Sequence, residues 1–278
     1  MAQREGSTHV GPFLFNGTRF LLGSLWLLPF IGRFKKPTAR QGIEGNLGKL
    51  LIPGLSLGIV LFVAASLQQV GIGYTTAGKA GFITGMYVIF VPLFGIFLKK
   101  EIRLLTAISA IIAFMGLYFL SIHGSFTLEL GDSLVFVSAV FWAVHVLLID
   151  HLVDRGDALK LAFLQFFLCG LISLSVALLL EDLHLESMLA AWLPILYAGL
   201  CSVGIGYTLQ LVAQREAHPA HASIIMSLEG LFAAIGGWLF LNELLSGREL
   251  VGCLLMLGGM MLSQLQFRKP PMTKSRPI

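Results

Sequence analysis

The side chains best suited to chemistry in this sequence are the few ionisable and polar groups that interrupt its long apolar runs. Glu229 lies nine residues into one such run. An ionisable group in a hydrocarbon environment costs roughly 2.5–3.5 kcal/mol on insertion scales, so it is a functional candidate by default. The carboxylate of Glu229 could bind a cationic group or take up a proton. The structural alternative is a protonated or hydrogen-bonded glutamate that holds two helices together.

Trp142 and His145 form a second candidate pair. They stand three residues apart, so on a helix they share a face. Together they could supply a stacking wall and a proton-accepting imidazole, because histidine changes charge near physiological pH. A hydrogen-bonded core histidine is the alternative. Lys79 stands in the stretch AGKAG at the mouth of an apolar run, where its ammonium group could attract an anionic substrate or extend to the membrane interface.

Neutral amides form a third group of candidates. Gln68, Gln69 and Gln210 lie within apolar runs. Interhelical hydrogen bonds, worth about 0.6–2 kcal/mol, explain them without a ligand, and the lining of a central cavity is the functional alternative. Asn16 and Arg19 share a helix face near the start of the first run. We expect Arg19 to anchor the chain at the membrane interface, or else to contact a substrate.

Enzymatic chemistry finds little support in the sequence. Residues 54–58 read GLSLG and match the GxSxG serine motif, but that motif needs a sharp turn between a strand and a helix, whereas this copy lies inside an apolar run. An intramembrane serine enzyme built on Ser56 is therefore a remote alternative. The sequence contains no HExxH, no P-loop with a nucleotide fold and no His/Cys cluster. Cys169, Cys201 and Cys253 are expected to be small buried hydrophobic residues. We expect no catalytic residue, metal or cofactor.

The composition indicates which elements carry these residues. Of 278 residues, 56% are hydrophobic and only 12% are charged, about half of the roughly 25% that soluble domains carry. The apolar residues come in blocks of about 20, the length that a helix needs to cross a hydrocarbon core. We therefore expect an all-α, polytopic membrane protein. The predicted transmembrane helices are at residues 12–32, 50–70, 78–98, 104–122, 131–150, 159–180, 191–213, 220–241 and 247–266.

Basic residues set the expected orientation, because short cytoplasmic loops are enriched in lysine and arginine. With a cytoplasmic C-terminal tail, the nine helices place fifteen of the 19 basic residues on the cytoplasmic side. The other side keeps four: Arg4, Arg19, Lys79 and Arg248. The C-terminus is therefore predicted to be cytoplasmic and Met1 to lie outside. This bias also explains the net charge of +4, so no nucleic-acid partner is implied.

The sequence resembles itself at an offset of 142 residues. Between positions 67 and 121, eleven of 55 residues are identical to the residue 142 positions later, among them the pairs Gln68/Gln210 and Glu101/Glu243. The two glutamates each precede a following helix. An acid there complements the unpaired N–H groups of the first helical turn, so we expect Glu101 and Glu243 to serve turns rather than a substrate.

The two copies have opposite predicted orientations, and such inverted repeats are characteristic of secondary carriers. We assign residues 1–125 to a first repeat of four helices and residues 126–278 to a second repeat of five. The counterpart of the 131–150 helix would lie before Met1, so we expect that a first helix is missing. At this offset Tyr87 pairs with Glu229, which makes Tyr87 a further candidate for a central site.

Four stretches make the chain similar to EamA-type permeases of the drug/metabolite transporter superfamily. These are YTTAGKAGFITGMYVIFVP (74–92), SLEGLFAAIGGWLFLNE (227–243), AVFWAVHVLLIDHLVDRGD (139–157) and FNGTRFLLG (15–23). The resemblance covers essentially the whole chain. It implies ten helices in two inverted five-helix repeats, cytoplasmic termini and a central cavity. It also implies the export of a small metabolite.

Together, the residues and the resemblance predict a secondary transporter that moves a small metabolite by alternating access, with possible proton coupling through Glu229 and His145. The predicted substrate-binding residues are Tyr87, Trp142, His145, Glu229, Gln68, Gln210 and Lys79. We expect a multi-pass protein of a bacterial inner membrane, in contact with lipid. A non-transporting membrane subunit or scaffold is the main alternative.

Overall fold

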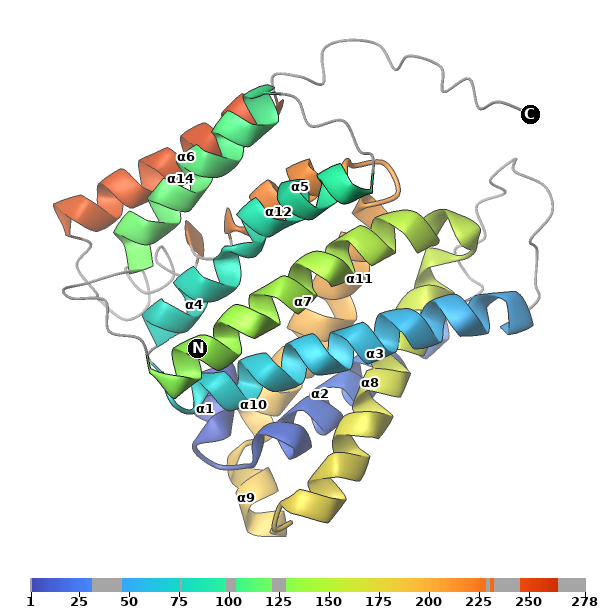
Figure 1. The fold of residues 1–278 in the computed structure, drawn as a ribbon. Coiled ribbons are helices and arrows are strands. Elements are labelled where there is room, and N and C mark those ends of the chain that lie inside the picture. Colours follow the sequence, from blue (N-terminus) through green and yellow to red (C-terminus); the bar gives the residue numbers. More distant parts are fainter. Residues whose placement is uncertain are drawn as a thin grey trace.

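The computed structural model describes residues 2–31, 47–75, 77–98, 104–121, 129–228, 231–232 and 246–264. Within these ranges the chain is helical and contains no strand (Figure 1). In chain order the elements are α1 (Ala2–Ser7), α2 (Pro12–Leu27), η1 (Leu28–Phe30), α3 (Leu47–Ile72), α4 (Ala77–Gly85), α5 (Tyr87–Phe97), α6 (Leu104–Ser121), α7 (Leu130–Leu152), η2 (Val153–Arg155), α8 (Ala158–Leu180), α9 (Leu185–Ala190), α10 (Trp192–Tyr197), η3 (Ala198–Tyr207), α11 (Thr208–Ala213), α12 (Pro219–Met226) and α14 (Gly247–Gln264).

The all-α membrane fold expected from the sequence is confirmed. The segments long and apolar enough to cross a membrane are Leu50–Ile72, Ala80–Phe97, Leu130–Leu152, Ala158–Leu180 and Trp192–Ala213, and Leu104–Phe119 is a shorter apolar helix. They coincide with the second to seventh predicted helices. The first prediction corresponds to α2 with η1 and the ninth to α14, whereas most of the eighth lies outside the described residues.

Helix ends in this chain are closed by nearby acids, which pair N–H groups that a helix leaves open. At the start of α7, Glu129 and Asp132 form a capping box, in which Asp132 Oδ2 accepts from the Glu129 N–H at 2.9 Å. At the start of α8, Asp157 accepts from the N–H groups of Leu159 and Lys160 at 2.8 and 3.4 Å. These contacts determine where the two long helices begin.

The start of α2 is closed by an acid from another helix. Glu181 follows α8 directly and accepts from the backbone N–H groups of Phe13 and Leu14 at 2.8 and 2.9 Å. Gly11 makes room for this carboxylate, because a Cβ there would lie 2.2 Å from the Glu181 Cδ. The end of α8 is thereby tied to the beginning of α2 across the bundle.

The long helices pack side by side in a consistent pattern. α2 packs along α8 and η3, α3 packs along α7 and α8, and α6 packs along α14. In Figure 1, α6 and α14 form an outlying pair, while α3 and α7 run through the middle of the molecule. The central core joins α2, α3, α7, α8 and α11 through buried side chains that include Phe20, Leu61, Trp142, Phe166 and Leu211.

Elements related by the 142-residue offset have matching bounds. α4 (Ala77–Gly85) corresponds to α12 (Pro219–Met226), and α6 (Leu104–Ser121) corresponds to α14 (Gly247–Gln264). A break follows α4 at Met86 and follows α12 at Ser227. The third pair differs: α3 is one continuous α-helix, whereas its counterpart is divided into α10, the π-helix η3 and α11.

Glycines allow α3 and α8 to approach closely, as the GxxxG spacing of Gly54 and Gly58 predicts. A Cβ on Gly54 would lie 2.6 Å from the Leu164 Cβ, and one on Gly58 would lie 3.0 Å from the Leu168 Cβ. Both distances are shorter than ordinary contacts, so a side chain at either position would push the helices apart. The backbone of α3 thus lies directly against α8.

We predict that Glu181→Ala lowers stability by about 1–2 kcal/mol, because the two N–H groups at the start of α2 lose their acceptor. The measurement is the midpoint of thermal unfolding in detergent, with a decrease of roughly 2–8 °C expected. Glu186→Ala is the matched control, because Glu186 is exposed and lies in the first turn of α9. Equal midpoints for the two variants would contradict the prediction.

Candidate functional site

Trp142 and His145 lie together near the middle of α7, as predicted. Trp142 stands 12 residues after Leu130 and 10 residues before Leu152, the two ends of α7. Both side chains are buried, with 8% and 3% of their surface exposed. Their ring centroids are 5.9 Å apart and the rings are nearly perpendicular, at 86°. An indole and an imidazole therefore meet at the depth where a central membrane site would lie.

This pair retains hydrogen-bonding capacity in the interior. The Nε2–H of His145 donates to Oε1 of Gln165 on α8 at 2.9 Å, so Nδ1 is the acceptor nitrogen of a neutral ring. Among the described residues, neither Nδ1 of His145 nor the indole N–H of Trp142 has a hydrogen-bond partner. Burial of an unsatisfied polar group costs about 1–3 kcal/mol. One acceptor and one donor, three residues apart on one helix, are thus available to a ligand or to water.

Tyr207 connects Trp142 to aromatic side chains from two further helices. The ring of Tyr207, the last residue of η3, lies 5.7 Å from Trp142. Tyr207 also lies 6.3 Å from Phe166 of α8 and 6.3 Å from Phe20 of α2, and Phe20 and Phe166 are 6.2 Å apart. We call Phe20, Trp142, Phe166 and Tyr207 the aromatic cluster. Its rings offer flat apolar faces and edges beside the unsatisfied polar atoms of Trp142 and His145.

Tyr87 joins the same part of the molecule, whereas Gln68 has a structural partner. Tyr87 begins α5, is partly buried and packs against the core that contains Trp142. The side-chain amide of Gln68 on α3 donates to Oγ1 of Thr84 on α4 at 3.0 Å, one turn before Tyr87. The interhelical hydrogen bond proposed for Gln68 from the sequence is therefore present.

Of the other predicted site residues, Gln210 lies in α11 and is partly buried. Lys79 belongs to α4, but its side chain lies outside the described residues. Glu229 and the turn acids Glu101 and Glu243 also lie outside them. Their predicted roles remain predictions.

The sequence reasoning missed Gln165 and three members of the aromatic cluster, Phe20, Phe166 and Tyr207. Gln165 interrupts the apolar run of α8, a signal that could have identified it in the same way as Gln68. Tyr207 had no comparable signal, because an aromatic residue in a membrane helix is unremarkable by itself. Its role follows from the π-helix, which turns it toward Trp142.

Arg19 does not lie at the membrane interface, so that expectation was wrong. It is 1% exposed, and its guanidinium carbon lies 4.8 and 5.5 Å from the ring centroids of Phe20 and Phe15. Its Nε donates to Asn16 Oδ1 at 3.0 Å. In the amide orientation that satisfies both groups, Gln3 Oε1 accepts from both Nη atoms at 2.9 and 3.1 Å. Rings and amides replace water around the charge, which explains how a cation can be buried here.

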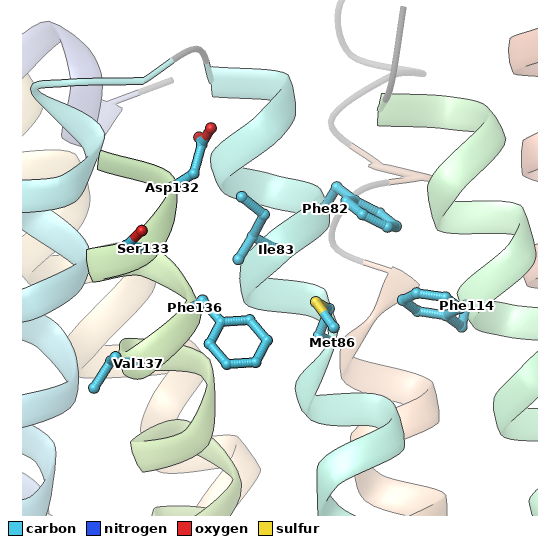
Figure 2. Close-up of a pocket in the computed structure, with 8 residues that line it drawn as sticks. All are labelled: Phe82, Ile83, Met86, Phe114, Asp132, Ser133, Phe136 and Val137. Carbon is cyan, nitrogen blue, oxygen red and sulfur yellow. The ribbon is translucent and has the colours of Figure 1, made fainter. Parts of the chain in front are cut away.

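A separate pocket of about 510 Å³ lies between α4, α6 and α7 (Figure 2). Its lining is Phe82, Ile83, Met86, Phe114, Asp132, Ser133, Phe136 and Val137. Figure 2 shows the Asp132 carboxylate turned away from the apolar lining, and this carboxylate accepts from the Thr75 hydroxyl. Among the predicted site residues whose side chains the structure describes, none lines this pocket, although Met86 directly precedes Tyr87.

Ser56 shows no arrangement of a serine nucleophile. It lies inside α3 rather than on a sharp turn, and its hydroxyl donates to the carbonyl of Pro53 at 2.9 Å. The GxSxG motif needs a strained strand-to-helix turn, so this copy is part of a helix–helix contact.

Comparison with known sequences decides the family. The sequence profile of the EamA-like transporter family matches residues 1–122 and 129–265. The chain belongs to the EamA-like transporter family. It is therefore a multi-pass integral membrane protein of a transporter family, as predicted.

Individual relatives agree with this family. An uncharacterized transporter of Archaeoglobus fulgidus is 30% identical over 249 residues, which are 89% of this chain and 75% of the relative. The threonine/homoserine exporter RhtA of Salmonella typhimurium is 27% identical over 264 residues, which are 92% of this chain and 83% of RhtA. The uncharacterized transporter YoaV of Bacillus subtilis is 22% identical and spans 97% of this chain and 92% of its own length.

A solved crystal structure has the same overall fold. It superposes with a TM-score of 0.76 at 17% sequence identity and covers 96% of this chain and 91% of its own. The arrangement of helices in this chain is thus one that a solved structure also has.

We predict that Arg19→Leu loosens α1, because α1 is held to α2 through Gln3. Loss of hydrogen bonds to a charged group costs about 1.5–3 kcal/mol, so backbone hydrogen exchange in residues 2–7 should accelerate at least about tenfold. Arg248→Leu is the matched control, since its guanidinium also lies over two rings, those of Tyr118 and Phe119. Unchanged protection of α1 in Arg19→Leu would contradict this prediction.

Proposed function

We propose that this chain is a secondary carrier that exports a small polar metabolite by alternating access. The observation that carries the proposal is the pair of buried, unsatisfied polar atoms on α7, the indole N–H of Trp142 and Nδ1 of His145. They lie midway along a membrane-spanning helix, beside the aromatic cluster. A substrate at this position would receive one hydrogen bond, donate another and stack on a ring. Midplane sites of this kind are typical of secondary transporters.

The division into repeats supports alternating access. We assign residues 1–125 and 126–278 to two inverted repeats, since α4 and α12 and then α6 and α14 have matching bounds at the 142-residue offset. A short break follows each of α4 and α12, and at the same sequence offset Tyr87 pairs with Glu229. Discontinuous helices in corresponding positions of two halves commonly form the substrate site of carriers. On this basis Glu229 and Tyr87 would complete the site opposite Trp142.

The chemistry of the site favours a small amphipathic substrate such as an amino acid. A hydroxylated amino acid carries donors and acceptors for Trp142 and His145 and a short carbon chain for the aromatic cluster. The relative RhtA, a threonine/homoserine exporter, points in the same direction. We therefore choose L-threonine and L-homoserine as the first substrates to test.

Proton coupling would act through His145. Its Nε2–H is engaged by Gln165 while Nδ1 is an available acceptor, so the ring can take up a proton without losing its existing hydrogen bond. A charged imidazole in the membrane interior is costly. Release of the proton to one side could therefore drive the change between the two open states.

The distribution of basic residues supports a cytoplasmic C-terminus, and a bacterial inner membrane is part of the same proposal. With this orientation α2, α7 and η3 run from the external to the cytoplasmic side. Export would load the substrate from the end of the bundle where α2 ends and α8 begins.

Efflux of radiolabelled L-threonine and L-homoserine from loaded vesicles tests the function, and absence of flux of both would remove this substrate class.

We predict that Trp142→Phe raises the half-saturating substrate concentration about tenfold, because the ring remains but its N–H donor is lost. Trp192→Phe is the matched control, since Trp192 is exposed. Equal effects of the two substitutions would argue against substrate contact at Trp142.

Coupling has its own test. Flux through the parent protein should increase when a proton gradient is imposed, whereas flux through His145→Gln should be the same with and without the gradient. Glutamine retains hydrogen-bonding groups but cannot be protonated near neutral pH. His151→Gln, at the exposed end of α7, is the control. A His145→Gln carrier that still responds to the gradient would rule out His145 as the coupling residue.

A further inference from the structure

The π-helix η3 differs from its counterpart in the other half of the chain in a way that suggests motion. η3 covers Ala198–Tyr207, ten residues with π geometry. π-Helices are rare, usually last a single turn and often occur at functional sites. At the 142-residue offset η3 corresponds to residues 56–65, which form the regular α-helical middle of α3. One repeat thus carries a conformation that the other does not.

The helix contacts show what the π geometry achieves. In the contact between α8 and the regular helix α3, Leu164 and Leu168 pack on Gly54 and Gly58. The two leucines are four residues apart, and so are the two glycines. In the contact between α2 and the π-helix η3, Leu22 and Trp26 of α2 are also four residues apart. They pack on Gly199 and Gly204, which are spaced by five.

A spacing of five on one face requires the wider π turn, since an α-helix brings residues i and i+4 together. A Cβ on Gly199 would lie 3.0 Å from the Leu22 Cβ, and one on Gly204 would lie 2.9 Å from the Trp26 Cδ1. The π-helix therefore places a glycine under each of the two α2 side chains, and this contact closes α2 onto η3.

If Ala198–Tyr207 were an α-helix, the residue one turn after Gly199 on the same face would be Val203 instead of Gly204. In the present structure Val203 packs against Gly23, where a Cβ would lie 2.5 Å from its Cγ1. A return to α geometry changes the helix register by about one residue, a rotation of roughly 100°. Val203 would then lie under Trp26 in place of Gly204, and its branched side chain would force α2 away from η3 at that end of the bundle.

Two features of this end favour the proposed opening. A small pocket of about 180 Å³ already lies there, with Trp26, Phe30, Leu159, Gly204 and Thr208 in its lining. The Thr208 hydroxyl is buried and, within the described part of the chain, has no hydrogen-bond partner. A threonine in an α-helix can donate to the carbonyl three or four residues earlier. The Thr208 hydroxyl would therefore gain a hydrogen-bond acceptor in the α form that it lacks in the π form.

We propose that Ala198–Tyr207 switches between π and α geometry, and that this switch closes and opens the bundle between α2 and η3 at Trp26. In the closed form Tyr207, the last residue of η3, contacts Trp142. The register change rotates Tyr207 relative to the rest of η3 and so couples the candidate site to this opening. The proposal rests on the proposed transport function for its purpose, but its test requires no substrate.

The test measures how fast a water-soluble methanethiosulfonate reagent labels a single thiol beside the opening. The reporter carries Thr208→Cys with Cys169→Ala, Cys201→Ala and Cys253→Ala, and it is reconstituted in lipid vesicles. Deletion of residue 201 in this reporter brings Gly199 and Gly204 to a spacing of four. Both glycines then stay under α2 in an α-helix, so labelling should slow about tenfold or more.

A second variant should change labelling in the opposite direction. Gly206→Ala favours α geometry without steric conflict, because its Cβ would meet only the Cys201 carbonyl at 3.4 Å. It leaves the five-residue spacing unchanged, so the α form brings Val203 under Trp26 and opens the bundle. Labelling should accelerate by up to roughly fivefold, the factor that corresponds to the full difference in α-helix propensity between glycine and alanine of about 1 kcal/mol. Gly258→Ala, equally unobstructed in the regular helix α14, is the control and should have no effect.

The two opposite shifts distinguish a switch from a loosened bundle and from a static π-helix. Faster labelling in both variants would mean general loosening, and unchanged labelling in both would mean a static π-helix; either result overturns the proposal. If the deletion variant fails to fold, hydrogen exchange of the unmodified protein decides: residues 198–207 should exchange faster than residues 56–65, and equal rates would overturn it. A chain that switches but carries neither amino acid would refute only the proposed substrate.

Discussion

The close contact between α2 and η3 determines how the candidate site is assembled. Lipid tails are as apolar as leucine, so helices in a membrane associate through close packing and interhelical hydrogen bonds rather than by exclusion from water. Gly199 and Gly204 provide such packing against Leu22 and Trp26. This contact holds η3 beside α2 and thereby brings Tyr207 to Phe20, Phe166 and Trp142. Without it the aromatic cluster would lose the residue that joins its members.

Polar groups inside this bundle follow two different patterns. The guanidinium of Arg19 is surrounded by the rings of Phe15 and Phe20 and by the amides of Asn16 and Gln3. These contacts serve the packing of α1 and α2. Trp142 and His145, in contrast, retain a donor and an acceptor without a partner among the described residues. An unsatisfied group in the interior lowers stability, which is the physical reason to assign a ligand to the second pattern and not to the first.

Among the described helices, elements related by the 142-residue offset are similar in extent, and η3 differs from its counterpart in α3. α4 and α12 begin and break at corresponding positions, and α2 packs on η3 as α8 packs on α3. Yet one of these contacts uses glycines spaced by four in an α-helix, and the other uses glycines spaced by five in a π-helix. Carriers with inverted repeats open to one side when their halves adopt different conformations. Under the proposed transport function, the one-residue difference between these two glycine spacings would be an asymmetry of this kind.

The sequence by itself determined the membrane fold, because hydrophobic length and sparse charge leave few alternatives to spanning helices. It also identified Trp142 and His145 as neighbours on one helix face, since helical periodicity is a local property. Only the tertiary structure decided which residues face them. Gln165 and Tyr207 belong to helices distant in sequence, and Tyr207 reaches Trp142 through a π turn that periodicity does not predict. The location of Arg19 was likewise decided by packing, because aromatic rings and amides from α1 and α2 enclose a charge that the sequence placed at the interface.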